Sequence, residues 1–207
     1  MPRDPTTLER RIRRHHQRSE LKEAATAAIE GFGPEILGFL VAVVRDKPLA
    51  GEVFTQFCEE LWSRLAAFHW KGNFRAWLYG LAWMAWQRLR REPHFRKTIS
   101  LPEEADIAAA GQRVRTVELP LVESALDKGV AGLRQSLDPE DQALLILRID
   151  RAMSWEEIAA VMLGGEEPGD DAALDRKAAL AQERFSQVTE NLKQLAREKR
   201  LIAEDES

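Results

Sequence analysis

Helical spacing of apolar residues recurs along almost the whole chain, and this periodicity is the feature that most limits the possible folds. Apolar side chains that return every three or four residues lie on one face of an α-helix, whereas a half-buried strand alternates with a period of two. Almost no segment of this chain alternates in that way. The sequence therefore predicts an all-α protein.

Glycine, proline and clusters of charge mark where the helices should end. The segment 31–34 contains two glycines and Pro34, so we expect it to interrupt the helical pattern, which then continues up to Lys47 and Pro48. The expected helices cover residues 8–30, 35–45, 50–67, a stretch that begins near 74, and 172–201.

Two small helical domains are expected on either side of a linker. Residues 95–120 contain two prolines, scattered charge and weak periodicity, which is typical of a linker with at most a short helix. The first domain then covers residues 1–94 and includes a basic N-terminal helix. The second domain covers residues 121–207.

Two helix starts are predicted in the second domain. Asp138 comes just before Pro139, which suits an N-cap residue followed by proline in the first helical turn. Ser154 is followed three residues later by Glu157, the spacing of a capping box.

The composition is that of a folded protein, with 44% apolar and 31% charged residues. No run of the sequence approaches the roughly 20 apolar residues that a membrane span needs, so no membrane association is expected. The N-terminal stretch MPRDPTTLERRIRRHHQR lacks the apolar segment of a signal peptide. We therefore expect a cytoplasmic location.

Neither catalysis nor a bound cofactor is expected. Cys58 is the single cysteine, so an internal disulfide and a cysteine-based metal site are excluded. The four histidines, at positions 15, 16, 69 and 94, do not have the spacing of metal ligands. We find no glycine-rich phosphate loop and no nucleophile paired with a histidine base.

Positive charge gathers in one part of the chain, although the net charge is −4. Between Trp70 and Lys97 the only acidic residue is Glu92. The basic residues of the same stretch are Lys71, Arg75, Arg88, Arg90, Arg91, Arg96 and Lys97. The positive charge is therefore concentrated where the tryptophans are.

The stretch FRAWLYGLAWMAWQRLRRE carries two helical stripes. The core stripe is expected to consist of Phe74, Trp77, Leu78, Leu81, Ala85 and Leu89, and the second stripe of Ala76, Tyr79, Trp83, Trp86 and Arg90. Exposed rings can stack on unpaired bases, at roughly 1–3 kcal/mol per base, while arginines neutralise phosphates. The second stripe therefore predicts a surface for single-stranded nucleic acid. Two other interpretations stay open: a helix enclosed between neighbours, and a helix that lies on a membrane surface.

Three segments together resemble the extracytoplasmic-function sigma factors of bacteria. They are AGEVFTQFCEELW at residues 50–62, the loop and helix AFHWKGNFRAWLYGLA, and SWEEIAAVMLG further downstream. The resemblance covers residues 32–91 as sigma region 2 and residues 133–201 as region 4. It implies a region 2 helical bundle and a region 4 helix-turn-helix. It also implies a subunit that directs RNA polymerase to promoters and melts the minus-ten element.

The resemblance implies two sites in region 2. The helix over residues 50–62 would bind the clamp helices of the polymerase β′ subunit, and its expected exposed polar residues are Glu52, Gln56, Glu59 and Glu60. Thr55 replaces a glutamine that is usual in the family. The loop 68–73 would hold a flipped base of the minus-ten element. The residues expected at the melted DNA are Trp70, Lys71, Asn73, Tyr79, Trp83, Trp86, Arg88, Arg90 and Arg91.

Region 4 departs from the family pattern. The segment GGEEPGDDAALDRKAALA is longer than the usual three- or four-residue turn of a helix-turn-helix. The minus-thirty-five element would be read by Arg176, Lys177, Gln182, Arg184 and Gln187. Alternatively, the apolar stripe of the final helix packs on its own domain, or binds an anti-sigma factor or a second copy of the chain. That stripe consists of Leu174, Ala178, Ala181, Phe185, Val188, Leu192 and Leu195.

Two further interpretations concern the whole protein and its N-terminus. A rival to the sigma-factor hypothesis is a sigma-like regulatory protein that binds polymerase or a regulator without recognising promoters. The basic run made of Arg10, Arg11, Arg13, Arg14, His15 and His16 is either a solvated helix face or a contact with DNA or polymerase.

Overall fold

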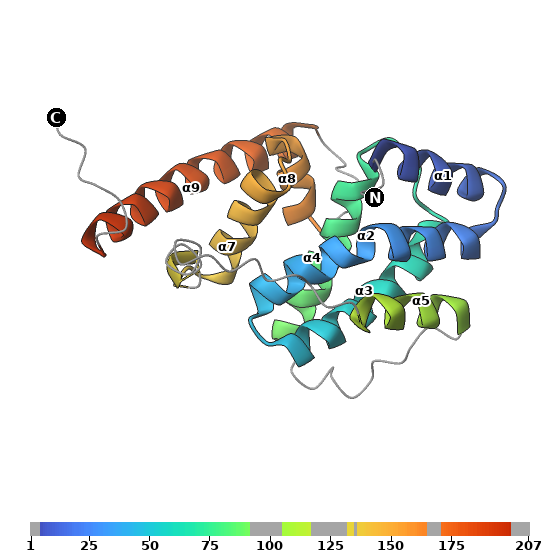
Figure 1. The fold of residues 1–207 in the computed structure, drawn as a ribbon. Helices are drawn as coiled ribbons and strands as arrows, with labels where there is room; N and C mark the ends of the chain where they lie inside the picture. Colours follow the sequence, from blue (N-terminus) through green and yellow to red (C-terminus); the bar gives the residue numbers. More distant parts are fainter. Residues whose placement is uncertain (1–4, 92–104, 117–131, 135, 165–170, 200–207) are drawn as a thin grey trace. The chain divides into compact units, whose positions relative to one another are not determined.

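The computed structural model describes residues 5–91, 105–116, 132–134, 136–164 and 171–199. Within these ranges every regular element is helical, and the all-α prediction is confirmed (Figure 1). The chain divides into two compact units. The first contains residues 1–119 and 160–168, and the second contains residues 120–159 and 169–207.

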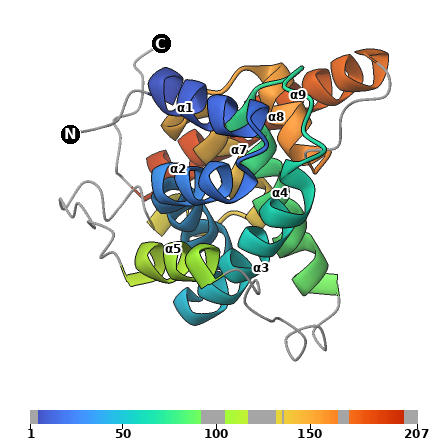
Figure 2. The same ribbon diagram turned by 90° about the vertical axis from the view of Figure 1, so that its right-hand side faces the viewer.

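Helix α2 is the centre of the first unit. Its ends are Leu21 and Val44, and it packs against the other four helices of that unit (Figures 1 and 2). These are α1 (Pro5–Gln17), α3 (Lys47–Leu65), α4 (Phe74–Arg91) and α5 (Ala105–Thr116). Because α2 has neighbours on several sides, twelve of its residues are buried, among them Phe32, Phe39 and Leu40.

The predicted helix over residues 8–30 is wrong, since the structure divides it between α1 and α2. The break falls at Arg18–Glu20, where Ser19 has a left-handed backbone with φ of 58°. The predicted interruption at residues 31–34 is also wrong, because α2 continues through Pro34. The glycines of this segment permit close packing instead. A Cβ atom on Gly33 would lie 3.0 Å from Val114 Cγ2 of α5.

Part of the predicted linker is a helix of the first unit. Helix α5 buries Ile107, Ala110 and Val114, which are spaced three and four residues apart. Two ion pairs join α5 to α2: Lys22 to Asp106 at 2.5 Å, and Arg113 to Glu30 at 2.6 Å. The predicted linker allowed for a short helix, and α5 is that helix; its apolar stripe folds against α2.

Helix α2 also corrects the expectation that no segment is apolar enough to span a membrane. An 18-residue window in it has a mean hydropathy of 1.7, which meets the length and composition of a span. Of that window, 56% is buried within the protein. A core helix surrounded by four others has the same composition as a span, because both are apolar on most sides.

The helices of the second unit include α7 (Pro139–Leu145), the π-helical turn η2 (Ile146–Asp150) and α9 (Asp171–Glu198). Residues 132–134 are also helical, and α8 (Trp155–Met162) begins in this unit, while its last three residues group with the first. Within this unit α9 packs on α7, and the Trp155 and Phe185 rings meet edge to face at 5.4 Å. Along the predicted apolar stripe of α9, Ala178 and Val188 are buried, whereas most of the other members are half-buried.

Both predicted helix starts are confirmed. The Asp138 side chain accepts hydrogen bonds from the backbone N–H groups of Glu140 and Asp141. In the capping box, the Ser154 N–H donates to Glu157 Oε2 at 2.7 Å and the Glu157 N–H donates to Ser154 Oγ at 3.2 Å. Such caps satisfy N–H groups that have no partner within the helix.

We predict that Gly33→Leu lowers the free energy of unfolding by about 1–3 kcal/mol, because the added side chain overfills the junction of α2, α3 and α5. Urea denaturation followed by circular dichroism measures the change. The control is Gly51→Ala on α3, where the nearest atom to an added Cβ is Arg115 Nε at 3.7 Å. This control should raise stability by about 0.5–1 kcal/mol. Equal stability of Gly33→Leu and the wild type would contradict the proposed close packing.

Candidate nucleic-acid interface

The loop between α3 and α4 holds a tryptophan in a fixed position. Trp70 has a left-handed backbone with φ of 59°, and its ring stacks on Phe74 at 4.9 Å with an interplanar angle of 15°. Phe68 contacts the same ring edge to face at 5.2 Å. From α1, the His16 ring lies 5.7 Å away and the Arg13 guanidinium lies over the indole at 5.7 Å. Phe74 thus stacks on the ring and Arg13 also lies over it, while the residue remains half-buried.

Polar side chains follow Trp70 at the tip of this loop. Lys71, Gly72 and Asn73 are exposed. The Asn73 side-chain oxygen accepts a hydrogen bond from the Ala76 N–H at 2.9 Å, so it caps the start of α4. The structure thus brings the three predicted loop residues together: a supported ring, an exposed ammonium group and a capping amide. Such a set can contact the flat face of a base and a neighbouring phosphate.

The prediction of an exposed aromatic row along α4 is wrong. Tyr79 has an exposed fraction of 0%, Trp83 of 4% and Trp86 of 9%. The Phe39 ring of α2 contacts both Tyr79, at 5.2 Å, and Trp83, at 6.5 Å. The reason is that α4 packs against both α2 and α3, so its second apolar stripe also finds a partner within the protein. These three rings therefore stabilise the fold and are not accessible to bases in this structure.

The arginines of α4 differ in their surroundings. Arg88 forms an ion pair with Glu60 of α3, whereas Arg90 and Arg91 are exposed at the end of the helix. Arg75 binds both carboxylate oxygens of Glu35, at 2.8 and 2.9 Å, and its guanidinium lies over Tyr79. Position 90 lies about 24 Å along the helix axis from position 74, so Arg90 and Arg91 are far from the loop tip.

The polar residues predicted to face polymerase do not form one exposed surface. Glu52 is exposed, but Gln56 has an exposed fraction of only 2%, which contradicts its predicted exposure. Glu59 is half-buried, and burial together with the nearby Glu60 carboxylate raises its pKa. Glu60 binds Arg64 at 2.8 Å as well as Arg88. Glu52, Gln56 and Glu60 are four residues apart and can share one face of α3. Neighbouring helices cover part of this face.

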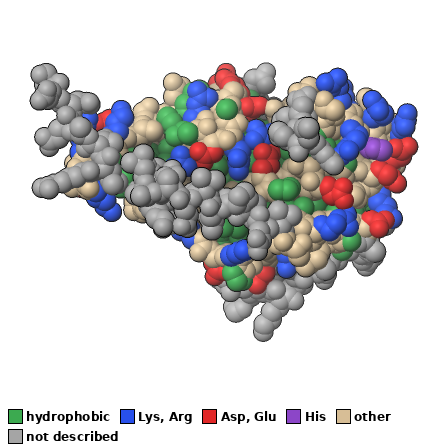
Figure 3. Space-filling model, viewed as in Figure 1, with side chains coloured by type: hydrophobic (Ala, Val, Ile, Leu, Met, Phe, Trp, Pro, Cys, Tyr) green, Lys and Arg blue, Asp and Glu red, His purple; other side chains and the backbone are tan. Residues whose placement is uncertain are grey.

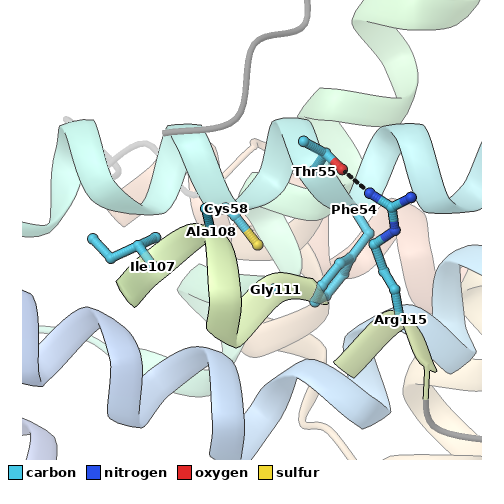
Figure 4. Close-up of a pocket in the computed structure, with 7 residues that line it drawn as sticks. All are labelled: Phe54, Thr55, Cys58, Ile107, Ala108, Gly111 and Arg115. Carbon is cyan, nitrogen blue, oxygen red and sulfur yellow. Dashed lines mark hydrogen bonds between the residues drawn. The ribbon is translucent and has the colours of Figure 1, made fainter. Parts of the chain in front are cut away.

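Helix α5 covers the adjacent side of α3. Arg115 donates a hydrogen bond to Thr55 Oγ1 at 2.9 Å, and Cys58 lies beneath Gly111 (Figure 4). The small space lined by these residues has no room for a water molecule. Burial raises the pKa of the Cys58 thiol to about 12, although Arg115 acts in the opposite direction. This contact between α3 and α5 is therefore a closely packed interface.

In the second unit, all five residues predicted to read DNA lie on the exposed surface of α9. They are Arg176, Lys177, Gln182, Arg184 and Gln187. Arg184, however, also binds α7: it donates to Asp141 at 2.6 and 3.0 Å and to Asp138 at 3.2 Å. The hydrogen bond with Asp141 is the main cause of its raised pKa. Arg184 therefore joins α9 to the start of α7, a structural role that the sequence analysis did not include.

A groove lies beside the C-terminal half of α9 in the same unit. It has a volume of about 320 Å³ and is lined mainly by apolar residues, including Leu133, Leu145 and Leu192. Arg134 and Lys193 lie at its edge, and Arg134 binds Asp150 at 2.9 Å. Ile149, also in the lining, has an exposed fraction of 52%. The groove has the apolar character of a surface that contacts protein.

Several contacts that shape these surfaces were missed from the sequence, although Arg13 and His16 are part of the basic N-terminal run noted there. Arg13 and His16 support Trp70, and Arg115 engages Thr55, yet all three come from segments distant in sequence from their partners. Only the alternation of basic and apolar residues in α1 could have indicated that this helix has one face against the protein. No cluster of three or more His, Cys, Asp or Glu side chains that could hold a metal ion occurs in the described ranges.

Comparisons with known proteins identify no relative of this chain. No family model matches the chain, and neither a search of curated proteins nor one of solved structures finds a match.

We predict that Cys58 reacts negligibly with a thiol reagent at pH 8 in the native protein and fully in urea. Its pKa is raised from 9.0 to about 12 on folding, so the folded state binds the thiol proton more tightly. The contribution of this thiol to the free energy of unfolding is fully present below about pH 9 and decreases as the pH rises toward 12. Urea denaturation at pH 8 and pH 10 measures this decrease. The Cys58→Ala variant should lack the thiol contribution, and equal decreases in both proteins would contradict this prediction.

We also predict a coupling energy of about 0.5–1 kcal/mol between Arg184 and Asp141, because the Arg184 side chain is half exposed and solvent screens its charge, although Asp141 is buried. A double-mutant cycle with Arg184→Ala, Asp141→Ala and the double variant measures it by urea denaturation. Gln187→Ala on the same exposed helix surface is the control and should change stability by less than about 0.5 kcal/mol. A coupling energy near zero would mean that the ion pair does not hold α9 on α7.

Proposed function

We propose that this protein is a sigma factor of the extracytoplasmic-function type, which acts in the cytoplasm by binding core RNA polymerase and opening promoter DNA. The observation that carries the proposal is the loop between α3 and α4, where Trp70 is held in position by Phe74 and by α1, and Lys71 and Asn73 follow at the exposed tip. This loop lies within the segment that resembles sigma region 2. The proposal assigns a region 2 bundle to the first unit and a region 4 helix-turn-helix mainly to the second, with residues 160–168 grouped with the first unit.

The chemistry of the loop suits the capture of one unpaired base. Extruding a base from a duplex costs a few kcal/mol, which contacts in the loop must offset. Trp70 offers an aromatic surface whose position is set by Phe68, Phe74 and α1 before DNA arrives, so little conformational entropy is lost on binding. Lys71 offers a charge for a phosphate. In this proposal the buried rings of α4 do not contact DNA and only stabilise the helix that follows the loop.

The contact with the β′ clamp helices is assigned to the exposed part of α3. Glu52 is exposed and Glu59 is half-buried, so these two acids remain as candidates. Glu60 already binds Arg64 and Arg88, and Gln56 is buried, so we leave both out of the proposed contact.

The contact with the minus-thirty-five element is assigned to the N-terminal half of α9. Arg176, Lys177, Gln182 and Gln187 are exposed there and have the side chains that reach base edges and phosphates in a major groove. Arg184 can add to this contact only by giving up part of its interaction with Asp138 and Asp141.

Two observations favour a second candidate, a sigma-like regulatory protein that does not recognise promoters. Arg184 is engaged by two carboxylates, and the apolar groove beside α9 suits a protein partner such as an anti-sigma factor. Both features lie in the second unit. The loop of the first unit has no evident use in that alternative, and for this reason we prefer the sigma factor.

Transcription tests the proposal directly. Core RNA polymerase from the native host is supplied with a library of promoter sequences, with and without this protein. The expected result is a set of new transcripts that share an upstream motif. Polymerase that binds the protein without initiating at new sites would favour the regulatory alternative.

We predict that Lys71→Ala reduces promoter opening about tenfold, which corresponds to the loss of about 1.4 kcal/mol of binding free energy. Permanganate reactivity of unpaired thymines measures opening, and co-purification measures polymerase binding, which should not change. Lys47→Ala is the control, since Lys47 is also an exposed lysine of the first unit but lies at the start of α3. Equal opening by the Lys71→Ala variant and the wild type would remove the loop from the DNA contact.

A further inference from the structure

The outer face of α1 is strongly basic. Leu8 and Ile12 are buried against the protein, with exposed fractions of 5% and 0%. Arg10, Arg13 and Arg14 are exposed, and Arg18 follows just after the helix. In Figure 3 the Lys and Arg side chains gather over α1. A helix that buries only two large apolar residues and presents several arginines carries more charge than its packing requires.

Several of these arginines lack an acidic partner within the described part of the chain. Among the described residues no carboxylate forms an ion pair with Arg10, Arg14 or Arg18. Arg10 donates only to the Thr6 backbone carbonyl, at 3.2 Å. The nearest ion pair of this region joins His15 to Glu20. The positive potential of the face is therefore directed toward solvent.

The basic face is continuous with the loop that carries Trp70. Arg13 lies over the Trp70 ring, and His16 both contacts that ring and hydrogen-bonds the Leu65 carbonyl at 2.9 Å. Lys71 follows directly at the exposed loop tip. A polyanion that contacts the loop can therefore extend along the arginines of α1.

We propose that this face of α1 binds the phosphate backbone of DNA without reading bases, and so extends the DNA contact of the loop. The inference rests on the proposed function for its biological setting, but the charge and geometry that carry it belong to α1. Arginines that neutralise phosphates release condensed counterions, which gives affinity independent of sequence.

The absence of exposed apolar residues on α1 distinguishes DNA from the other anionic partners. A helix on a membrane surface inserts large apolar side chains below the headgroups, and a protein interface centres on buried aromatic or aliphatic residues. The large apolar residues exposed within the described ranges are Ile149 and Leu180, and neither belongs to α1. Charge without an apolar centre fits a phosphate backbone best.

The test removes three charges from α1. The variant Arg10→Gln/Arg14→Gln/Arg18→Gln leaves Arg13 on Trp70, and circular dichroism checks that it remains folded. The control variant Lys47→Gln/Lys193→Gln/Lys199→Gln removes the same charge from exposed lysines outside α1. Binding to a fluorescent DNA duplex of random sequence is measured over a range of salt concentrations, for the protein alone and for its mixture with core polymerase.

The logarithm of the binding constant should fall linearly with the logarithm of the salt concentration. Each lost phosphate contact reduces the magnitude of this slope by about 0.9, so we expect a reduction of about 2 to 3 for the α1 variant and little change for the control. Equal slopes for the two variants, or no DNA binding by the wild type in either mixture, would overturn the inference. Lost binding to anionic lipid vesicles with unchanged DNA binding would also overturn it, in favour of a membrane.

The design separates this inference from the proposed function. A wild type that initiates transcription while both variants share one slope supports the sigma factor and rejects the role of α1. A wild type that never initiates, but binds DNA with a slope that depends on α1, rejects the sigma factor and supports the α1 surface.

Discussion

The structure of the first unit depends on the burial of α2 on several sides at once. A single helix with so much apolar surface needs neighbours around it, and it obtains them from both ends of the unit: α1 at the start of the chain and α5 at its end. The packing around α2 is close at Gly33, since Phe54 of α3 and Val114 of α5 both approach its backbone. The surfaces left for partners are those that remain once α2 is covered.

The need to bury α2 on several sides also determines the roles of the aromatic residues. A sequence with six tryptophans suggests stacking surfaces, yet the core takes most of the rings of α4 because Phe39 of α2 must also be covered. Trp70 differs because it lies in a loop and contacts only the edge of the core. The proposed DNA contact is thus reduced from a row of rings to one ring surrounded by charge. The remaining affinity has to come from arginines and lysines.

The sequence predicted the features that depend on local spacing. The all-α fold and the caps at Asp138 and Ser154 follow from periodicity and from hydrogen bonds between residues close in sequence, and the structure confirms them. The predictions from sequence were wrong where tertiary packing decides how far a helix continues or which side chains are buried. Pro34 did not end α2, because packing on both sides of that helix compensates for one lost hydrogen bond. Exposure of Tyr79 and Gln56 could not be predicted, since it depends on which helix lies opposite.

The hydrogen bond from His16 to the Leu65 carbonyl joins positions 49 residues apart, and that from Arg115 to Thr55 joins positions 60 apart. Such separations affect the order of folding during synthesis. Helix α1 leaves the ribosome before the other helices of the first unit but cannot complete its contacts until the end of α3 has followed, and α3 stays uncovered on one side until α5 emerges. The nascent chain therefore exposes apolar surface of α2 for an extended period. A host with little chaperone capacity should accumulate this protein as aggregates when translation outpaces the closure of these long-range contacts.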